Sequence, residues 1–190
     1  MNLVPLMPDT LVETQHLAAE LFPWEHEHQA ALHAAVSSAT HTAFLGERGL
    51  ASVRFWTSLQ AGRVAGLAGL YNYTAQPDET WLAWYGLHAA ARGRGKGAEL
   101  LDWVIAEARA EKKSVLRLWT TDEEEYTKAL ALYRVRGFRC EPWSALPGET
   151  WRTYVLSLGL EGIEPLPWAL RSPGRELCGR EAPQPQRVAA

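Results

Sequence analysis

The chain has 190 residues, 47% of them hydrophobic, so it is long and apolar enough for a globular domain with a substantial core. Its formal net charge of −3 argues against a broad basic surface for nucleic acid, and its two cysteines, Cys140 and Cys178, match neither a disulfide framework nor a metal-ligand pattern. No signal-peptide pattern opens the sequence and no apolar run reaches about 18 residues, so we expect a cytoplasmic protein with no membrane partner.

The first half of the chain predicts helices followed by antiparallel strands. Pro8 favours a helix start, and Pro23 ends the apolar helical pattern that follows it. Further on, Ala61-Gly62 separates two runs rich in β-branched and aromatic residues, which is typical of a hairpin. The predicted order is a strand, two helices and three strands, over residues 2–7, 8–22, 24–38, 51–60, 63–73 and 79–88.

The second half alternates helices and strands. Apolar residues spaced by about 3.6 residues predict a helix that begins at Ala98 and ends near Lys113. Asp122 and Glu125 form a D-x-x-E start pattern for another helix, which ends at Gly137. Strands are predicted over residues 114–120, 138–143 and 150–158, the last two as an antiparallel pair. These elements predict an α/β fold with a mixed, mostly antiparallel central sheet flanked by helices.

The composition changes at Gly159, and we divide the chain there. Five of the eleven prolines and four of the fifteen glycines fall within residues 159–190. Segments of this composition form few regular elements. We therefore predict one domain over residues 1–158 and an irregular tail over residues 159–190.

The hexapeptide Arg92-Gly93-Arg94-Gly95-Lys96-Gly97 is the strongest indication of function. It lies between a predicted strand and a predicted helix, where backbone N–H groups and the helix dipole favour an anion. A Walker-type loop is excluded because Gly97 follows Lys96, and a dinucleotide loop is disfavoured because Ala98 stands at the third glycine position. Two interpretations stay open for this segment alone: a coenzyme A pyrophosphate site, and a tight turn with no ligand.

A second segment, Ala129 to Phe138, reads A-x-x-L-Y-x-x-x-G-F. Together with the Arg-x-x-Gly-x-Gly spacing that begins at Arg92, it resembles the GNAT N-acetyltransferase superfamily, with both motifs in that family's order. The resemblance covers residues 1–158, although the specific motifs lie only between about 80 and 140. It implies the GNAT acyl-CoA N-acyltransferase fold and acetyl-CoA as co-substrate.

The resemblance also implies roles for individual residues. The strand before the loop would pair with the pantetheine arm, and the loop would hold the pyrophosphate. Tyr133 would be the acid that protonates the departing thiolate. Tyr126 stands where many members carry a cofactor-contacting Asn, which puts that contact in doubt. The implied cofactor-binding residues are Tyr85, Gly86, Leu87, Arg92, Gly93, Arg94, Gly95, Lys96, Gly97, Ala98, Tyr126 and Tyr133.

The group that accepts the proton of the amine is less defined. Glu79 and His88 are retained as catalytic candidates beside Tyr133, because Glu79 opens the strand before the loop and His88 ends it. Asp122 and Glu123 are weaker candidates, since Asp122 also suits a helix cap.

The run Glu25-His26-Glu27-His28 lacks a usual metal-ligand spacing and is interpreted as a solvated helix start. In the resembled family this region helps to line the acceptor pocket, so these groups are also candidates for substrate contact. Trp84 is one of nine tryptophans and is interpreted either as a core residue or as a wall of that pocket.

These expectations combine into an acetyl-CoA-dependent N-acetyltransferase that acts by direct transfer on a small amine or a peptide amine. No nucleic acid, membrane or metal partner is expected, and a homodimer is left open. Two alternatives are kept: a non-catalytic acyl-CoA-binding module, and an acyltransferase of the same fold that uses a longer acyl-CoA. Acetyl transfer to a panel of amines separates the first alternative, and competition between acyl chain lengths separates the second.

Overall fold

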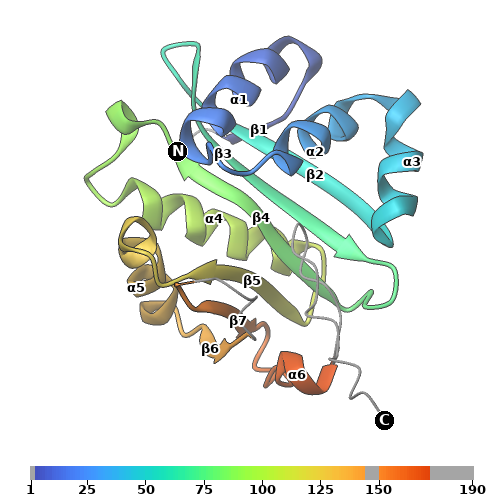
Figure 1. Ribbon diagram of the computed structural model, residues 1–190, viewed down its shortest axis with the longest axis vertical. Helices are drawn as coiled ribbons and strands as arrows, with labels where there is room; N and C mark the ends of the chain where they lie inside the picture. Colours follow the sequence, from blue (N-terminus) through green and yellow to red (C-terminus); the bar gives the residue numbers. More distant parts are fainter. Residues whose placement is uncertain (1–2, 144–149, 172–190) are drawn as a thin grey trace. The chain divides into compact units, whose positions relative to one another are not determined.

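The computed structural model describes residues 3–143 and 150–171 of the chain (Figure 1), which divides into two compact units, residues 1–116 and 117–190. The described residues form seven strands and mostly antiparallel pairs, so the predicted α/β class is confirmed. In this part of the chain, no helix combines the length and the apolar character needed to cross a membrane.

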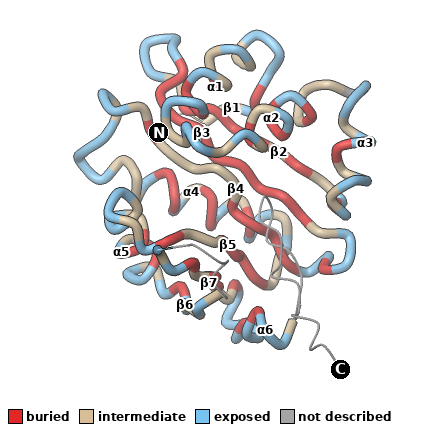
Figure 2. The backbone as a smooth tube through the Cα atoms, viewed as in Figure 1, coloured by how far each residue is buried: buried red, intermediate tan, exposed pale blue. Residues whose placement is uncertain are grey.

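Four antiparallel strands form the sheet of the first unit, in the order β1-β2-β3-β4. Their bounds are Leu3–Pro5, Leu50–Gln60, Arg63–Tyr73 and Glu79–Leu87. The predicted hairpin at Ala61-Gly62 is confirmed, and both turn residues have positive φ (49° and 77°), as a tight two-residue hairpin requires. Residues 64–72 of β3 are all buried (Figure 2), so this strand lies in the middle of the core.

Helices cover both faces of this sheet. The first three helices are α1 (Pro8–Leu21), α2 (Glu27–Val36) and α3 (Ser38–Arg48), and α4 (Lys96–Ala110) follows the glycine-rich loop. Phe55 of β2 points to the α2 side, where its ring stacks on Trp84. The next residue, Trp56, points to the other face and packs edge-on against Trp103 of α4. This alternation follows from the strand period of two.

The structure corrects two helix predictions in this unit. The second helix is shorter than residues 24–38 and is followed by α3, which we did not predict. Ser37 separates the two helices because its backbone is extended (φ −107°, ψ 107°), and Gly49 ends α3 in a left-handed conformation. The helix expected to begin at Ala98 begins at Lys96, so the last residues of the hexapeptide belong to its first turn.

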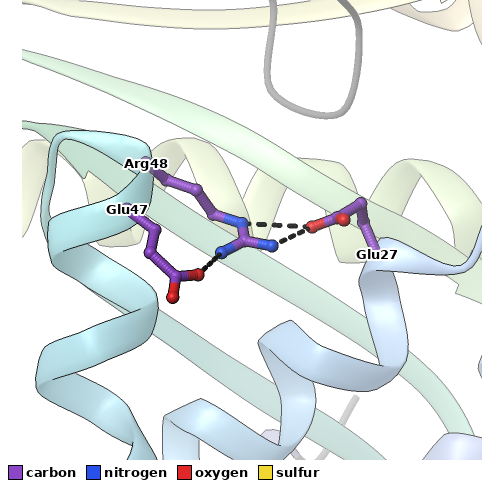
Figure 3. Close-up of polar contacts among 3 residues, drawn as sticks. All are labelled: Glu27, Glu47 and Arg48. Atoms are coloured by element: carbon purple, nitrogen blue, oxygen red, sulfur yellow. Dashed lines mark hydrogen bonds and ion pairs between the residues drawn. The ribbon is translucent and has the colours of Figure 1, made fainter.

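A charged contact joins α2 to the end of α3. Arg48 makes an ion pair of 2.7 Å with Glu27 of α2 and one of 3.1 Å with its neighbour Glu47 (Figure 3). The same guanidinium lies 4.1 Å from the ring centroid of Phe44. Two N–H groups of Arg48, from Nε and Nη2, donate to the same Glu27 oxygen, Oε2, and this contact over an aromatic ring fixes the direction of α3 more firmly than a single surface hydrogen bond does.

The described residues of the second unit form three neighbouring strands in the order β5-β7-β6 and two α-helices. Their bounds are Val115–Thr121 (β5), Thr127–Val135 (α5), Arg139–Pro142 (β6), Thr153–Gly159 (β7) and Trp168–Arg171 (α6). The predicted antiparallel pairing of the last two strands is confirmed, with Arg139 opposite Ser157. The start of β5 lies at the boundary between the units.

The segment that follows the last strand, residues 160–171, packs onto this unit, and we call it the latch segment. Arg117 of β5 is fully buried and donates to the hydroxyl of Ser157 (2.6 Å) and to the carbonyl of Leu166 (2.9 Å). Its guanidinium also lies 5.6 Å from the ring of Trp168, which is 1% exposed. The Glu141 carboxylate accepts the N–H groups of Trp168 and Ala169 at the start of α6. The rest of the predicted tail, residues 172–190, lies outside the described residues.

Trp168→Ala tests how much the latch segment contributes to stability. Removing this buried ring should lower the free energy of unfolding by about 3–5 kcal/mol, as large-to-small changes of buried aromatic residues do. Leu170→Ala on the same helix is the matched control, because Leu170 is 74% exposed and its loss should change stability by less than about 0.5 kcal/mol. Urea unfolding measures both. Equal stabilities for the two variants would contradict a structural role for the latch segment.

Candidate functional site

Three successive residues of the loop after β4 have left-handed backbones. The chain leaves β4, forms a short 3₁₀ turn over Ala89–Ala91 and then enters the loop, where Gly93, Arg94 and Gly95 have φ of 88°, 49° and 75°. Gly95 is the N-cap of α4, and its carbonyl accepts the N–H of Glu99 (3.0 Å). Gly95 is left-handed and Lys96 is right-handed, and such a change of hand turns successive backbone N–H groups toward one point, which favours an anion.

The loop has room for an anion of phosphate size. A Cβ added to Gly93 or Gly95 would meet no heavy atom within 4 Å, and one added to Gly97 would meet only the Tyr85 hydroxyl, at 3.6 Å. Gly97 and Ala98 are the second and third residues of α4, so helix geometry gives their N–H groups no acceptor within the helix. The positive end of the helix dipole adds to this field. The residues present therefore fit a pyrophosphate.

The basic side chains of the loop are tied to the protein in different ways. Arg92 donates through Nε to the carbonyl of Leu87 (2.9 Å), which holds it against the end of β4. Lys96 pairs with Glu99 at 2.6 Å, and this hydrogen bond is the largest of the contributions that lower the pKa of the Glu99 carboxyl to about 2. Glu99 therefore stays charged and offsets part of the positive charge of Lys96.

The strand residues expected to bind pantetheine lie beside this loop. The Tyr85 hydroxyl donates to the carbonyl of Gly97, so the strand and the first turn of α4 are joined directly. Gly86 pairs with Leu67 of β3. A Cβ added to Gly86 would lie 2.7 Å from the side chain of Leu21 in α1. One unit of the structure thus brings together Tyr85, Gly86, Leu87 and the residues from Arg92 to Ala98.

A β-bulge in β4 is a feature that the sequence did not reveal. Ala68 pairs with Tyr85, but Leu70 pairs with Leu82, so two residues of β4, Ala83 and Trp84, lie opposite Gly69 of β3. A bulge shifts the phase of side chains along the strand and is common next to functional sites. In the sequence, the one indication of this bulge was a glycine within an apolar strand pattern.

His88 and Glu79 lie at opposite ends of β4. The N–H of His88 donates to the carbonyl of Ala65 (2.9 Å), its Nδ1 accepts the N–H of Ala90 (3.2 Å), and its Nε2 lies 3.8 Å from the Glu20 carboxylate. Glu79 is buried at the start of the strand, about 20 Å from Tyr85 at the usual rise of a strand. The structure therefore places His88, and not Glu79, with the loop.

The other predicted residues lie in the second unit. Asp122 is not a helix cap, because α5 begins at Thr127 and the Asp122 carboxylate accepts the N–H of Arg152 (2.7 Å). A D-x-x-E pattern does not distinguish a cap from such a loop contact. Glu123 accepts from the Thr121 hydroxyl at 2.7 Å.

Tyr126 and Tyr133 both belong to the α5 region. Tyr126 occupies the N-cap position of α5. Tyr133 is 6% exposed on that helix, and its ring centroid lies 5.6 Å from that of Phe138. Gly137 (φ 85°) follows the helix, as the A-x-x-L-Y-x-x-x-G-F segment predicts, and Phe138 donates its N–H to the carbonyl of Tyr133.

The side chains of the run from Glu25 to His28 contact different partners in the structure. The carboxylate of Glu25 accepts the indole N–H of Trp84, and that of Glu27 pairs with Arg48. His28 is buried, with Nε2 3.2 Å from the Phe22 carbonyl and Nδ1 2.8 Å from the Gln29 side-chain nitrogen. Within residues 3–143 and 150–171 no three His, Cys, Asp or Glu residues gather in a way that could hold a metal ion.

Four rings in mutual contact form what we call the aromatic cluster: Trp84, its neighbours His28 and Phe55, and Phe22, which contacts His28. The Trp84 ring is stacked on Phe55 at 6.2 Å and meets His28 edge-on at 5.9 Å. Burial lowers the pKa of His28, so its imidazole is neutral near neutral pH. Glu25 and Trp84 are 59 positions apart in the sequence, so no local pattern predicts their contact.

The lowered pKa of His28 predicts a pH-dependent stability. The folded protein resists protonation at His28, whereas the unfolded chain takes up a proton near pH 6.5, so the free energy of unfolding should fall as the pH drops below about 6.5. His28→Gln removes this titration. Urea unfolding of both proteins at mildly acidic and neutral pH should show a smaller acid-induced loss in the variant, and an identical loss would contradict the assignment.

Comparison with known proteins identifies the family of this architecture. The model of the acetyltransferase (GNAT) family matches residues 11–138, more than half of the chain. No curated protein matches the sequence.

Solved structures show the same fold at low identity. A GNAT-family protein from Desulfovibrio desulfuricans has a TM-score of 0.66 at 15% identity and is matched over 83% of this chain and 98% of its own. The ribosomal-protein-S18-alanine N-acetyltransferase of Escherichia coli has a TM-score of 0.60 at 20% identity, over 86% and 99%. Arabidopsis thaliana NAA60, solved in complex with acetyl-CoA, has a TM-score of 0.59 at 14% identity, over 85% and 99%. The predicted GNAT fold is therefore confirmed.

Proposed function

Since the chain belongs to the GNAT acetyltransferase family, we propose that it transfers the acetyl group of acetyl-CoA directly to an amine. The observation that carries this proposal is the loop of left-handed residues before α4, joined to β4 by the Tyr85–Gly97 hydrogen bond. The structure of NAA60 with acetyl-CoA supports the choice of co-substrate, and the peptide amine named for the Escherichia coli enzyme supports an amine acceptor.

In this proposal the chain's backbone does most of the binding. The amides of the loop and of Gly97 and Ala98 hold the pyrophosphate, and the backbone of Tyr85 to Leu87 pairs with pantetheine. A backbone N–H of that strand polarises the thioester carbonyl, in the manner of an oxyanion hole. Acetyl-CoA supplies the activated acyl group when bound, and Tyr126 is kept as a further proposed cofactor-binding residue.

The chemistry requires an uncharged amine. An amine with the pKa of lysine, about 10.4, costs about 4 kcal/mol to present uncharged at neutral pH, whereas an α-amino group with a pKa of about 8 costs about 1 kcal/mol. A proton acceptor near Tyr85–Leu87 therefore matters most for an alkyl amine. Glu79 lies too far along β4 to accept the amine proton without intervening water. His88 directly follows Leu87 and is therefore the nearer of the two candidate proton acceptors.

Tyr133 is the proposed acid. The pKa of its phenol, about 10, is close enough to that of a thiol, about 8.5, for the phenol to donate a proton to the departing sulfur.

The expected cytoplasmic location and the homodimer stay predictions. Acetyl-CoA consumption with polyamines, aminoglycosides, amino acids and peptide N-termini tests the activity, and tight binding without any turnover would favour a non-catalytic acyl-CoA-binding module.

Gly95→Asp tests the loop as the pyrophosphate site. An aspartate there adds bulk and negative charge beside the bound phosphate, so affinity for CoA in calorimetry should fall by about tenfold or more. Gly62→Asp is the matched control, because Gly62 has nearly the same φ (77° against 75°) and equally open surroundings in the β2–β3 turn. If both variants bind CoA as well as the parent, the site lies elsewhere.

Tyr133→Phe tests the acid. The substitution removes only a hydroxyl, so packing against Phe138 should persist while kcat falls by about 10²–10⁴-fold. KM for acetyl-CoA should move little, since ground-state binding is assigned to the loop. Tyr154→Phe in β7 of the same unit is the control. A folded Tyr133→Phe protein with full turnover would remove Tyr133 from the reaction.

A further inference from the structure

The hydrogen bond between Trp84 and Glu25 holds a carboxylate beside the strand to which the thioester is assigned. Glu25 lies in the connection between α1 and α2, and its carboxylate accepts the indole N–H of Trp84 in β4. Its own N–H donates to the carbonyl of Phe22 (3.1 Å), so the backbone of this connection is turned and fixed at the same point. Glu25 and Trp84 are both partly exposed, so solvent reaches the pair.

Side chains along β4 alternate between the two faces of the sheet, so neighbouring residues make contacts on opposite faces. Trp84 and Tyr85 are consecutive, so their side chains leave the strand on opposite faces. Tyr85 reaches Gly97 at the start of α4, on the face that carries Trp56 and Trp103. Trp84 reaches Glu25 on the face that carries Phe55 and His28. A thioester held along Tyr85–Leu87 thus has the phosphate loop on one face and the Glu25 carboxylate on the other.

We propose that Glu25, positioned by Trp84, binds the protonated acceptor amine and takes its proton. This inference rests on the proposed acetyl transfer and names the acceptor class as a cationic primary amine. The aromatic cluster supports it in two ways. Ring faces attract a cation, and the buried, neutral His28 adds no opposing positive charge. An aromatic wall also lowers the local dielectric, which strengthens the attraction between an ammonium and a carboxylate.

The proton balance is complete. The ammonium gives one proton to the Glu25 carboxylate, and the neutral nitrogen attacks the acetyl carbon. As the carbon–nitrogen bond forms and the carbon–sulfur bond breaks, the sulfur takes a proton from the Tyr133 hydroxyl. The nitrogen then loses its second proton, which restores Tyr133, and Glu25 releases its proton to water. The products are the acetamide, CoA and one proton.

A binding experiment tests the inference without requiring turnover. In ¹⁵N-labelled protein saturated with CoA, the indole resonance of Trp84 is identified by its loss in Trp84→Phe. Ethylammonium, spermidine and alanyl-alanine amide are then titrated in turn. At least one should shift this resonance saturably, and Glu25→Gln should weaken that binding by about tenfold or more, as the loss of a charge-assisted hydrogen bond does.

Glu27→Gln is the matched control, because Glu27 lies two residues away and its carboxylate pairs with Arg48 (Figure 3). It should bind the amines as the parent does. The inference is overturned if none of the three amines shifts the Trp84 resonance saturably, or if Glu25→Gln binds them with parental affinity.

Kinetics separate a proton acceptor from a structural residue. For an amine that is acetylated, Glu25→Gln should lower kcat/KM by about 10²–10⁴-fold near neutral pH, with the deficit shrinking as the pH approaches the pKa of the amine. KM for acetyl-CoA should not change. Trp84→Phe, which acts through Glu25, should give a smaller loss, and adding it to Glu25→Gln should cost nothing further.

The outcomes distinguish this inference from the proposed function. Equal acetylation by Glu25→Gln and the parent overturns the role of Glu25 and leaves acetyl transfer intact. Glu25-dependent amine binding, with no acetylation of any amine in the wider panel, overturns acetyl transfer and leaves the amine site standing.

Discussion

The ring of Phe55 covers Gly69 of β3, and the bulge of β4 lies opposite this glycine. An added Cβ at Gly69 would lie 2.9 Å from Cζ of Phe55 and closer still to two other ring atoms, so the position accepts no side chain. Opposite Gly69, β4 accommodates two residues instead of one. That extra residue sets which side chains face each side of the sheet from Trp84 onward, and so directs Tyr85 to the loop and Trp84 to Glu25.

Much of the fold could be predicted because its signals are local. The Ala61-Gly62 turn and the Gly137 helix end each depend on a few neighbouring residues, and each was found. The glycine-rich loop was also recognisable from local sequence, since glycine spacing and basic side chains stand together there. The end of α2 was missed because Ser37 interrupts an otherwise continuous helical pattern without a proline or glycine.

The rest of the candidate site depends on contacts between distant residues. Glu25 and Trp84 are 59 positions apart, and a run that alternates Glu and His gives no sign that only one of its carboxylates meets an indole. At Asp122 a local pattern predicted a contact that does not form. The pattern suggested a helix cap, whereas the Asp122 carboxylate accepts the backbone N–H of Arg152. Patterns predict which residues can make such contacts, and packing decides which of them do.

The buried Arg117 has a consequence for the order in which the chain becomes structured during synthesis. Its acceptors at Ser157 and Leu166 follow it by 40 and 49 residues, and the Trp168 ring follows later still. A buried guanidinium requires hydrogen-bond acceptors, so the arrangement of Arg117 seen here is complete only once Ser157, Leu166 and Trp168 have been synthesised. These contacts of the second unit therefore form only after nearly all of the described chain has left the ribosome.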